Sequence, residues 1–266
     1  METTPALSII LPYYKRYQAF KQATALNSTK QTSVSGRETE IVLVLDEPTE
    51  ERPVLELVSS YTEISWRVLI NRRDHLWRNP AVAINVGIRH AEGKYVLIMS
   101  PESIYVSDVP GILQQSCALL PDTFAVGRIV FYERSMIGGH ELVSVFDQGR
   151  PNLYYGSICV AREALEKIGG YDEANETWGG DDDNIRERLL LSGLEIEYIP
   201  AAQVIHPRDN NPRHGPLRDI KQTKTPNELQ DCVMPRQAIA NGRDWGREFD
   251  EIIYDYRSAT YRSPTM

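Results

Sequence analysis

The stretch AVAINVGIRHAEGKYVLIMSPE, residues 81–102, contains the pattern that decides the fold. Its first part predicts a helix, because apolar residues recur from Val82 to Ile88 and Gly93 follows as a stop. The apolar run YVLIM at residues 95–99 then predicts a short buried strand, which ends at Ser100-Pro101. One helix therefore leads into one strand, and polar residues come directly after that strand.

The same alternation occurs earlier in the chain. We expect helices over residues 15–30 and 53–61, and buried strands over residues 6–11, 40–45 and 66–70. Strands that alternate with helices in this way predict an α/β fold with a mostly parallel central sheet and helices on both faces.

The second half of the chain is less regular. We expect strands over 124–131 and 194–199, the latter ended by Pro200, and helices over 162–168 and 181–191. A weak helical pattern also covers 236–252.

Ligands of such sheets bind outside the carboxyl ends of the strands. The residues that follow the four predicted strands of the first half are polar or aromatic. They are Pro12-Tyr13-Tyr14, Asp46-Glu47, residues 71–74 and Ser100-Pro101-Glu102. This composition predicts a polar ligand.

Composition narrows the classes of partner. The chain has 266 residues, of which 41% are hydrophobic and 25% charged, and its formal net charge is −8. An acidic chain of this kind is not expected to bind nucleic acid, whose phosphates select basic surfaces. A local basic pocket can still hold a diphosphate.

The three cysteines and the N-terminus indicate the compartment. Cys117, Cys159 and Cys232 are far apart and form no CxxC pair, so we expect reduced thiols. The first residues lack the features of a signal peptide, and no stretch is long enough to cross a bilayer. We therefore expect a cytoplasmic protein without a transmembrane segment, while peripheral membrane association and the oligomeric state stay open.

The segment Trp178-Gly179-Gly180-Asp181-Asp182-Asp183 is the strongest candidate for chemistry. Three adjacent carboxylates repel one another and raise each other's pKa, which is costly. The two glycines allow close backbone approach, and the tryptophan offers a flat apolar face on which a sugar ring can dock. The alternative is that the acids are only first-turn residues of a solvated helix.

This segment and its surroundings resemble inverting GT-A glycosyltransferases, a Rossmann-like fold, of a family 2 type with a galactosyltransferase-type C-terminal half. The resemblance includes the lead-in Ile168-Gly169-Gly170-Tyr171-Asp172-Glu173 and the strand that leads into Val204-Ile205-His206. Upstream it includes Arg78-Asn79-Pro80-Ala81, Asn85 and residues 91–95. It covers roughly residues 7–206.

The resemblance implies a role for each matching residue. Asp182 would be the catalytic base, and Trp178, Gly180 and Asp181 would bind the acceptor. The nucleotide sugar would contact Pro12, Tyr13, Asp46, Arg78, Asn85 and Ser100. The reaction would move a hexose or N-acetylhexosamine from a nucleotide-diphosphate sugar, with UDP as the expected nucleotide, to a hydroxyl of a glycan or a small glycosylated acceptor.

The metal motif departs from the family pattern. The family has Asp-x-Asp after its fourth strand, whereas this chain has Ser100-Pro101-Glu102. Glu102 is then the acid that can hold Mn²⁺ or Mg²⁺, and His206 is a second candidate ligand because Mn²⁺ also accepts imidazole. The incomplete motif leaves metal dependence open.

We expect a GT-A domain over residues 1–206, with a nucleotide-binding half at 1–105 and an acceptor half at 106–206. Residues 207–266 would form a C-terminal extension, in which the basic segment before residue 224 is either a lid over the diphosphate or a solvated linker. Three other interpretations stay open: a retaining or GDP-mannose-using transferase, a non-catalytic binding module on a degenerate fold, and a nucleotidyltransferase.

Overall fold

The computed structural model describes residues 5–30, 38–137, 140–146, 157–207, 224–258 and 260–261. Within these ranges, eleven strands form one sheet in the order β11-β10-β3-β2-β1-β4-β8-β6-β9-β5, and β7 pairs with β6 outside this path. The strands are β1 (Leu7–Tyr13), β2 (Thr39–Leu45), β3 (Ser65–Ile70), β4 (Tyr95–Ile98), β5 (Ile104–Tyr105), β6 (Thr123–Ile137), β7 (His140–Phe146), β8 (Ile158–Ala161), β9 (Glu195–Pro207), β10 (Glu251–Asp255) and β11 (Thr260–Tyr261). The helices are α1 (Tyr17–Lys30), α2 (Glu51–Ser59), α3 (Ala81–His90), α4 (Val109–Leu119), α5 (Arg162–Ile168), α6 (Asp181–Leu191) and α8 (Pro226–Val233).

The four predicted strands of the first half are the parallel part of the sheet. β1 pairs in parallel with both β2 and β4, and β2 pairs in parallel with β3. Beyond β4 the sheet is mixed, because β8 is antiparallel to β4 and to β6 while β6 and β9 are parallel. The predicted α/β class is confirmed, with its parallel pairing concentrated in the first half.

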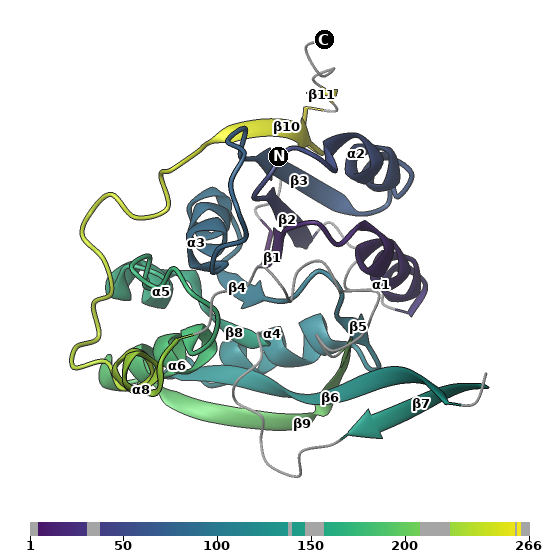
Figure 1. Cartoon of the computed structure of the whole chain (residues 1–266). Coiled ribbons are helices and arrows are strands. Elements are labelled where there is room, and N and C mark those ends of the chain that lie inside the picture. Colours follow the sequence, from purple (N-terminus) through teal and green to yellow (C-terminus); the bar gives the residue numbers. More distant parts are fainter. Residues whose placement is uncertain are drawn as a thin grey trace.

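Helices cover both faces of this sheet, as predicted (Figure 1). Side chains alternate along each buried strand, so that Ile9 and Leu11 of β1 join one apolar cluster and Ile10 joins the other;. The first cluster includes residues of α1, α2 and α4, and the second includes residues of α3, α5 and α6. Continuous apolar strands are therefore buried on both sides, which is why they read as unbroken hydrophobic runs.

One predicted boundary was wrong at Pro200. β9 does not end there but continues to Pro207, alongside β6. The register between the two strands shifts at this point, since Gly127 pairs with Ile199 and Arg128 pairs with Gln203. Proline lacks the N–H that a regular ladder needs but is tolerated at such an irregularity. The longer β9 brings His206 to the far end of the strand.

The C-terminal segment returns to the sheet. α8 packs against α6, and β10 pairs antiparallel with β3 at the edge of the nucleotide-binding half (Figure 1). The expected helix over 236–252 was wrong, since the helix of this region ends at Val233 and residue 251 begins β10. The expected lid falls largely on residues 208–223, outside the described part of the chain. The domain boundary at residue 206 stays a prediction.

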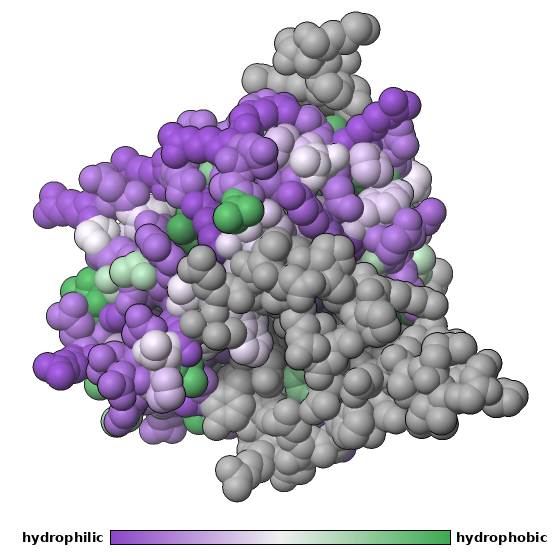
Figure 2. Space-filling view, viewed as in Figure 1, coloured by the Kyte–Doolittle hydropathy of each residue, from purple (hydrophilic) through white to green (hydrophobic). Residues whose placement is uncertain are grey.

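The hydropathy of the surface can be followed on one face of the molecule. In Figure 2 the described residues of one face are mostly hydrophilic, with hydrophobic residues in separate spots. Scattered apolar side chains are normal on a globular protein and do not indicate a partner surface. Within the described ranges, every helix is too short or too polar to cross a bilayer.

Candidate active site

Asp46 lies directly after β2, where the parallel strands end. Its carboxylate is buried and accepts hydrogen bonds from Arg78, at 2.8 Å between Nε and Oδ2 and 2.6 Å between Nη2 and Oδ1. Oδ1 also accepts from Asn71 Nδ2 at 3.1 Å, and His75 Nε2 lies 3.4 Å from it. Burial by itself would raise the pKa of Asp46, but Arg78, His75 and Asn71 together hold it below its usual value;. The site therefore holds a fixed carboxylate.

Pro12 and Tyr13 lie at the end of β1, as expected for this edge, but the tyrosine points inward. Tyr13 is only 1% exposed, and its hydroxyl donates a hydrogen bond to Glu50. Burial, with Glu50 adding to it, raises the pKa of the Tyr13 hydroxyl. The next residue, Tyr14, donates to the His75 carbonyl oxygen at 3.0 Å, and its ring centroid lies 5.7 Å from the His75 ring. Tyr14, directly after β1, is thus the tyrosine that reaches the Asp46 cluster.

Glu102 and His206 lie together, although 104 positions separate them in the chain. His206 Nε2 is 3.6 Å from Glu102 Oε1, and the Arg16 guanidinium also pairs with Glu102. The side chain of Glu102 is almost fully buried, and its Oε2 atom has no hydrogen-bond partner among the described residues. A buried carboxylate oxygen without a partner, next to an imidazole, suits a divalent cation.

Two protein ligands do not complete a metal site. Within the described ranges, no group of three or more His, Cys, Asp or Glu side chains could hold a metal ion. Sites for Mg²⁺ or Mn²⁺ that serve phosphate chemistry commonly use one or two protein ligands together with substrate phosphates and water. Glu102 and His206 therefore fit a metal that arrives with a diphosphate.

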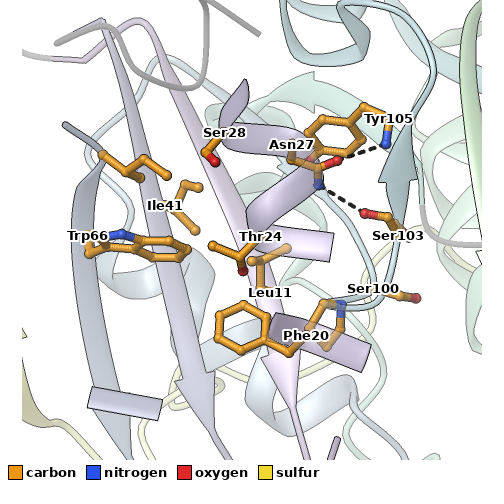
Figure 3. A pocket seen from close by; sticks show the side chains of 12 residues that line it. Leu11, Phe20, Thr24, Asn27, Ser28, Ile41, Trp66, Ser100, Ser103 and Tyr105 are labelled. Atoms are coloured by element: carbon orange, nitrogen blue, oxygen red, sulfur yellow. Dashed lines mark hydrogen bonds between the residues drawn. The ribbon is translucent and has the colours of Figure 1, made fainter. Parts of the chain in front are cut away.

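Ser100 is one of the residues that line a small cavity (Figure 3). The cavity lies between α1 and the turn that leads into β5, where Asn27 donates to the Ser103 carbonyl oxygen and accepts from the Tyr105 amide. Its volume is about 20 Å³, which is room for a single water molecule;. This cavity is too small for a nucleotide, so Ser100 could contact a nucleotide sugar only from its solvent side.

The turn before α6 has the backbone that the glycine pair predicts. Gly179 and Gly180 have φ values of 99° and 82°, a region that glycine adopts without strain;. A Cβ atom at residue 180 would lie 3.0 Å from Cys232 Sγ and 3.1 Å from Leu229 Cδ1, both on α8. The indole of Trp178 remains 43% exposed. The turn therefore combines close packing against α8 with an accessible aromatic face.

The three carboxylates occupy the first turn of α6, as predicted, where the helix dipole favours negative charge;. Burial, with Asp181 adding to it, raises the pKa of Asp183, while Arg186 at 3.1 Å opposes the shift. Asp182 and Asp181 reinforce the effect of burial in raising the pKa of the Tyr171 hydroxyl.

Direct hydrogen bonds join this turn to the nucleotide-binding half. The Asn79 backbone amide donates to the Glu176 carbonyl oxygen at 3.0 Å. The Asn79 side-chain amide donates to the Thr177 carbonyl oxygen at 3.1 Å. Lys224 Nζ donates to the same Thr177 oxygen at 2.7 Å. Because Asn79 follows Arg78, the segment that reaches Asp46 also holds the residues just before Trp178. Asp46 and the Trp178 turn thus belong to one connected region.

Asn85 does not join this region, contrary to expectation. It is fully buried, and its side-chain amide donates to the Tyr171 carbonyl oxygen at 2.8 Å and to Glu173 at 2.9 Å. Its carbonyl oxygen accepts from the Tyr171 amide at 2.7 Å. These bonds tie α3 to the segment before α6, and we therefore assign Asn85 a structural role.

Sequence reasoning did not single out several residues at this edge. Tyr14 and Asn71 belong to segments that were marked as polar strand ends, and His75 directly follows one of them, so position after a strand was an available signal. Arg16 and Asn79 had no such signal as partners of Glu102 and of the residues before Trp178. Their roles depend on contacts between segments far apart in sequence.

Comparison with known proteins identifies two regions. A family model described as glycosyl transferase family 2 matches residues 8–134, and one described as N-terminal domain of galactosyltransferase matches residues 145–211. The human polypeptide N-acetylgalactosaminyltransferase 3 is 30% identical over 105 residues, which are 39% of this chain and 15% of that protein. A probable N-acetylgalactosaminyltransferase 9 of Caenorhabditis elegans is 38% identical over 56 residues, 21% of this chain and 10% of that protein. The matched segments thus span only 10% to 15% of these relatives.

Two solved structures share the fold. GalNAc-T7, determined with UDP, GalNAc and Mn²⁺, aligns with a TM-score of 0.58 and 14% identity, over 78% of this chain and 45% of that one. A mannosyltransferase of Pyrobaculum calidifontis, in complex with GDP-Man and Mn²⁺, aligns with a TM-score of 0.56 and 15% identity, over 87% and 70%.

The family models match the two regions in the predicted order, and the fold agrees with them. The expected resemblance is confirmed for both halves. The chain therefore has the GT-A fold, with a region similar to glycosyl transferase family 2 followed by a galactosyltransferase-type region.

Proposed function

We propose that this enzyme transfers a hexose or N-acetylhexosamine from a UDP-sugar to a sugar hydroxyl, in the synthesis of a glycan or polysaccharide. The N-acetylgalactosaminyltransferase relatives support an N-acetylhexosamine and a UDP donor. This chain matches only 10% to 15% of the length of those relatives, so its donor and its acceptor are part of the proposal.

The observation that carries the proposal is the contact between Glu102 and His206. Both were expected to hold a metal, and they lie 3.6 Å apart; among the described residues, the second carboxylate oxygen of Glu102 has no hydrogen-bond partner. A bound Mn²⁺ or Mg²⁺ there would neutralise charge on the diphosphate as it leaves. A core packed only for stability has no evident reason to bury such an oxygen.

In the proposed reaction, the acceptor oxygen attacks the anomeric carbon from the side opposite the diphosphate. The bond between that carbon and the diphosphate oxygen breaks, and the diphosphate leaves with the bonding electron pair. Asp182 accepts the hydroxyl proton of the acceptor, and Asp181 and Gly180 orient the acceptor, whose ring packs on Trp178. A single displacement of this kind inverts the anomeric configuration.

Asp46 and Arg78 would hold the base of the nucleotide on the opposite side of this region. Pro12 and Tyr14 border the same place at the end of β1. The hydrogen bonds of Asn79 to residues 176 and 177 would then keep the donor in register with the acceptor.

A nucleotide-release assay tests the proposal. The chain is incubated with Mn²⁺, a panel of p-nitrophenyl glycosides as acceptors, and UDP-GalNAc, UDP-Gal, UDP-GlcNAc or GDP-mannose. We expect transfer from a UDP-sugar with inversion. Asp182→Asn should slow transfer about a hundredfold or more without weakening UDP binding.

Asp122→Asn is a matched control, because Asp122 is an exposed aspartate ahead of β6. It should keep the wild-type rate. Wild-type turnover in the Asp182→Asn variant would refute the role of Asp182 as the base. The absence of binding to every nucleotide and nucleotide sugar would refute the proposed function as a whole.

One observation favours a second candidate, a mannosyl donor. The mannosyltransferase structure covers more of this chain than the GalNAc-T7 structure does, 87% against 78%. Turnover of GDP-mannose alone in the same panel would establish this alternative. Retention of the anomeric configuration in the product would refute the proposed single displacement.

A further inference from the structure

Glu248 reaches the candidate nucleotide site from outside both regions matched by the family models. Arg78 Nη1 donates to both carboxylate oxygens of Glu248, each at 2.9 Å, while Nε and Nη2 of the same guanidinium hold Asp46. Arg78 thus bridges two carboxylates. Its side chain is 22% exposed and that of Glu248 is 30% exposed, so the bridge is partly accessible to solvent.

Two anchors fix the segment that carries Glu248. Before it, Arg89 Nε donates to the Trp245 carbonyl oxygen at 3.0 Å, and the Gly246 amide donates to Glu173 at 2.7 Å. After it, Glu251 pairs with Ile70 as β10 joins β3. Exposed ion pairs usually contribute little unless they belong to a network, and here Arg78 holds Asp46 through two nitrogens and Glu248 through the third;.

The bridge limits how many further hydrogen bonds the Asp46 carboxylate can accept. An ionised carboxylate has about four acceptor positions, two on each oxygen. Among the residues that the structure describes, Oδ1 accepts from Arg78 and from Asn71, whereas Oδ2 accepts from Arg78 alone. One acceptor position on Oδ2 therefore remains for a ligand.

We infer that Glu248 is a positioning residue of the donor site: by fixing Arg78 across both oxygens of Asp46, it leaves a single acceptor and so selects uracil over guanine. Uracil presents one N–H on its pairing edge, which one carboxylate oxygen satisfies. Guanine presents two neighbouring N–H donors, which need both oxygens of a carboxylate. Binding guanine would leave a buried donor unpaired, and such a donor costs binding energy.

This inference rests on the proposed function, since it assumes that Asp46 meets the nucleotide base. It adds a residue of the C-terminal segment to the donor site and gives that residue a defined effect on specificity. Loss of the Glu248 carboxylate would let Arg78 turn away and free a second acceptor position on Asp46.

Isothermal titration calorimetry with UDP and with GDP, in the presence of Mn²⁺, tests the inference on the full chain. The wild type should bind UDP about tenfold more tightly than GDP or better. Glu248→Gln should weaken UDP binding about fivefold to tenfold and leave GDP binding the same or tighter, so that the preference shrinks. Glu248→Asp should restore part of the preference.

Glu251→Gln is the matched control. Glu251 lies in the same segment and pairs with an arginine, Arg72, at 2.7 Å, but the pair has no bond to Asp46. It should keep the wild-type preference, and thermal melting confirms that each variant is folded.

Each remaining outcome has a separate meaning. Wild-type preference for GDP, or equal affinity, would overturn the selection of uracil while the donor site stands. An unchanged preference in Glu248→Gln, or an equal loss in Glu251→Gln, would overturn the positioning role. A wild type that binds neither nucleotide would refute the proposed function, on which the inference depends.

Discussion

Asp46 and Glu102 are two buried carboxylates at the same edge of the sheet, and they differ in how their oxygens are used. Asp46 accepts hydrogen bonds from Arg78 and Asn71. Despite its burial, these partners hold the pKa of Asp46 below its usual value. Glu102 has Arg16 and His206 beside Oε1, but within the described part of the chain its Oε2 has no hydrogen-bond partner. The first arrangement fits a neutral N–H donor at a fixed place, whereas the second fits a cation. One sheet edge can thus hold the base and the diphosphate of the same nucleotide by different chemistry.

The largest expected effect comes from removing the cation that Asp46 depends on. Arg78→Met should lower the free energy of unfolding by about 3 kcal/mol, because a buried carboxylate that loses its charged partner keeps its desolvation cost. Asn71 and His75 remain and limit the loss. Urea unfolding at pH 7 measures the change.

Arg52→Met is the control for that measurement. Arg52 pairs with Glu56 one turn along α2, and its side chain is 84% exposed. The variant should change the free energy of unfolding by less than about 0.5 kcal/mol. Equal changes in the two variants would mean that the Asp46 cluster contributes no more than a surface pair.

A smaller effect is expected at Glu102, and it concerns binding. Glu102→Gln keeps the size of the side chain but removes its charge. It should weaken UDP binding in the presence of Mn²⁺ about tenfold, because the ion loses its one carboxylate ligand in the protein. Binding of UDP in EDTA should be alike in the two proteins.

Calorimetry of both proteins with and without Mn²⁺ separates these cases. If Mn²⁺ strengthens UDP binding equally in the wild type and the variant, Glu102 does not hold the metal. If Mn²⁺ has no effect on either protein, the pairing of Glu102 with Arg16 and His206 is structural, and the proposed use of a metal is wrong.

Position after a strand explains why both acids could be found from sequence. Asp46 and Glu102 follow strands whose apolar runs are unbroken, and parallel strands bring their carboxyl ends to one edge. The start of α6 could also be predicted from sequence, because Gly180 and three acids are typical of a helix N-terminus. These features are local, so they need no knowledge of how distant segments meet.

The partners of those acids could not be found in the same way. Glu248 and Arg78 are 170 positions apart, and their contact depends on β10 joining the edge of the sheet beside β3. No local pattern around residue 251 predicts that pairing, and the same segment was expected to be helical. Asn85 was assigned to the nucleotide by its place in a motif, yet the structure uses it to hold α3 to the segment of Tyr171.

The smallest expected effect is a pH dependence of the Asp46 cluster. The Asp46 carboxylate raises the pKa of His75 above its usual value, despite partial burial of the ring. A raised pKa in the folded state means that protonated His75 stabilises the fold below about pH 6.5, and that this contribution is lost as pH rises through the raised value. The stability advantage of the wild type over His75→Gln should therefore be larger at pH 5.5 than at pH 8.5, as measured by urea unfolding at both values.

His90 provides a control of opposite sign. Burial, with the charge of Arg67 adding to it, lowers the pKa of His90. The folded state therefore resists protonation of this ring, and the stability that neutral His90 contributes is present above about pH 6.5 and lost as pH falls below that value. The advantage of the wild type over His90→Gln should accordingly be larger at pH 8.5 than at pH 5.5. Profiles of the same sign for the two variants would show that a general effect of pH, and not the pairing of His75 with Asp46, controls the first profile.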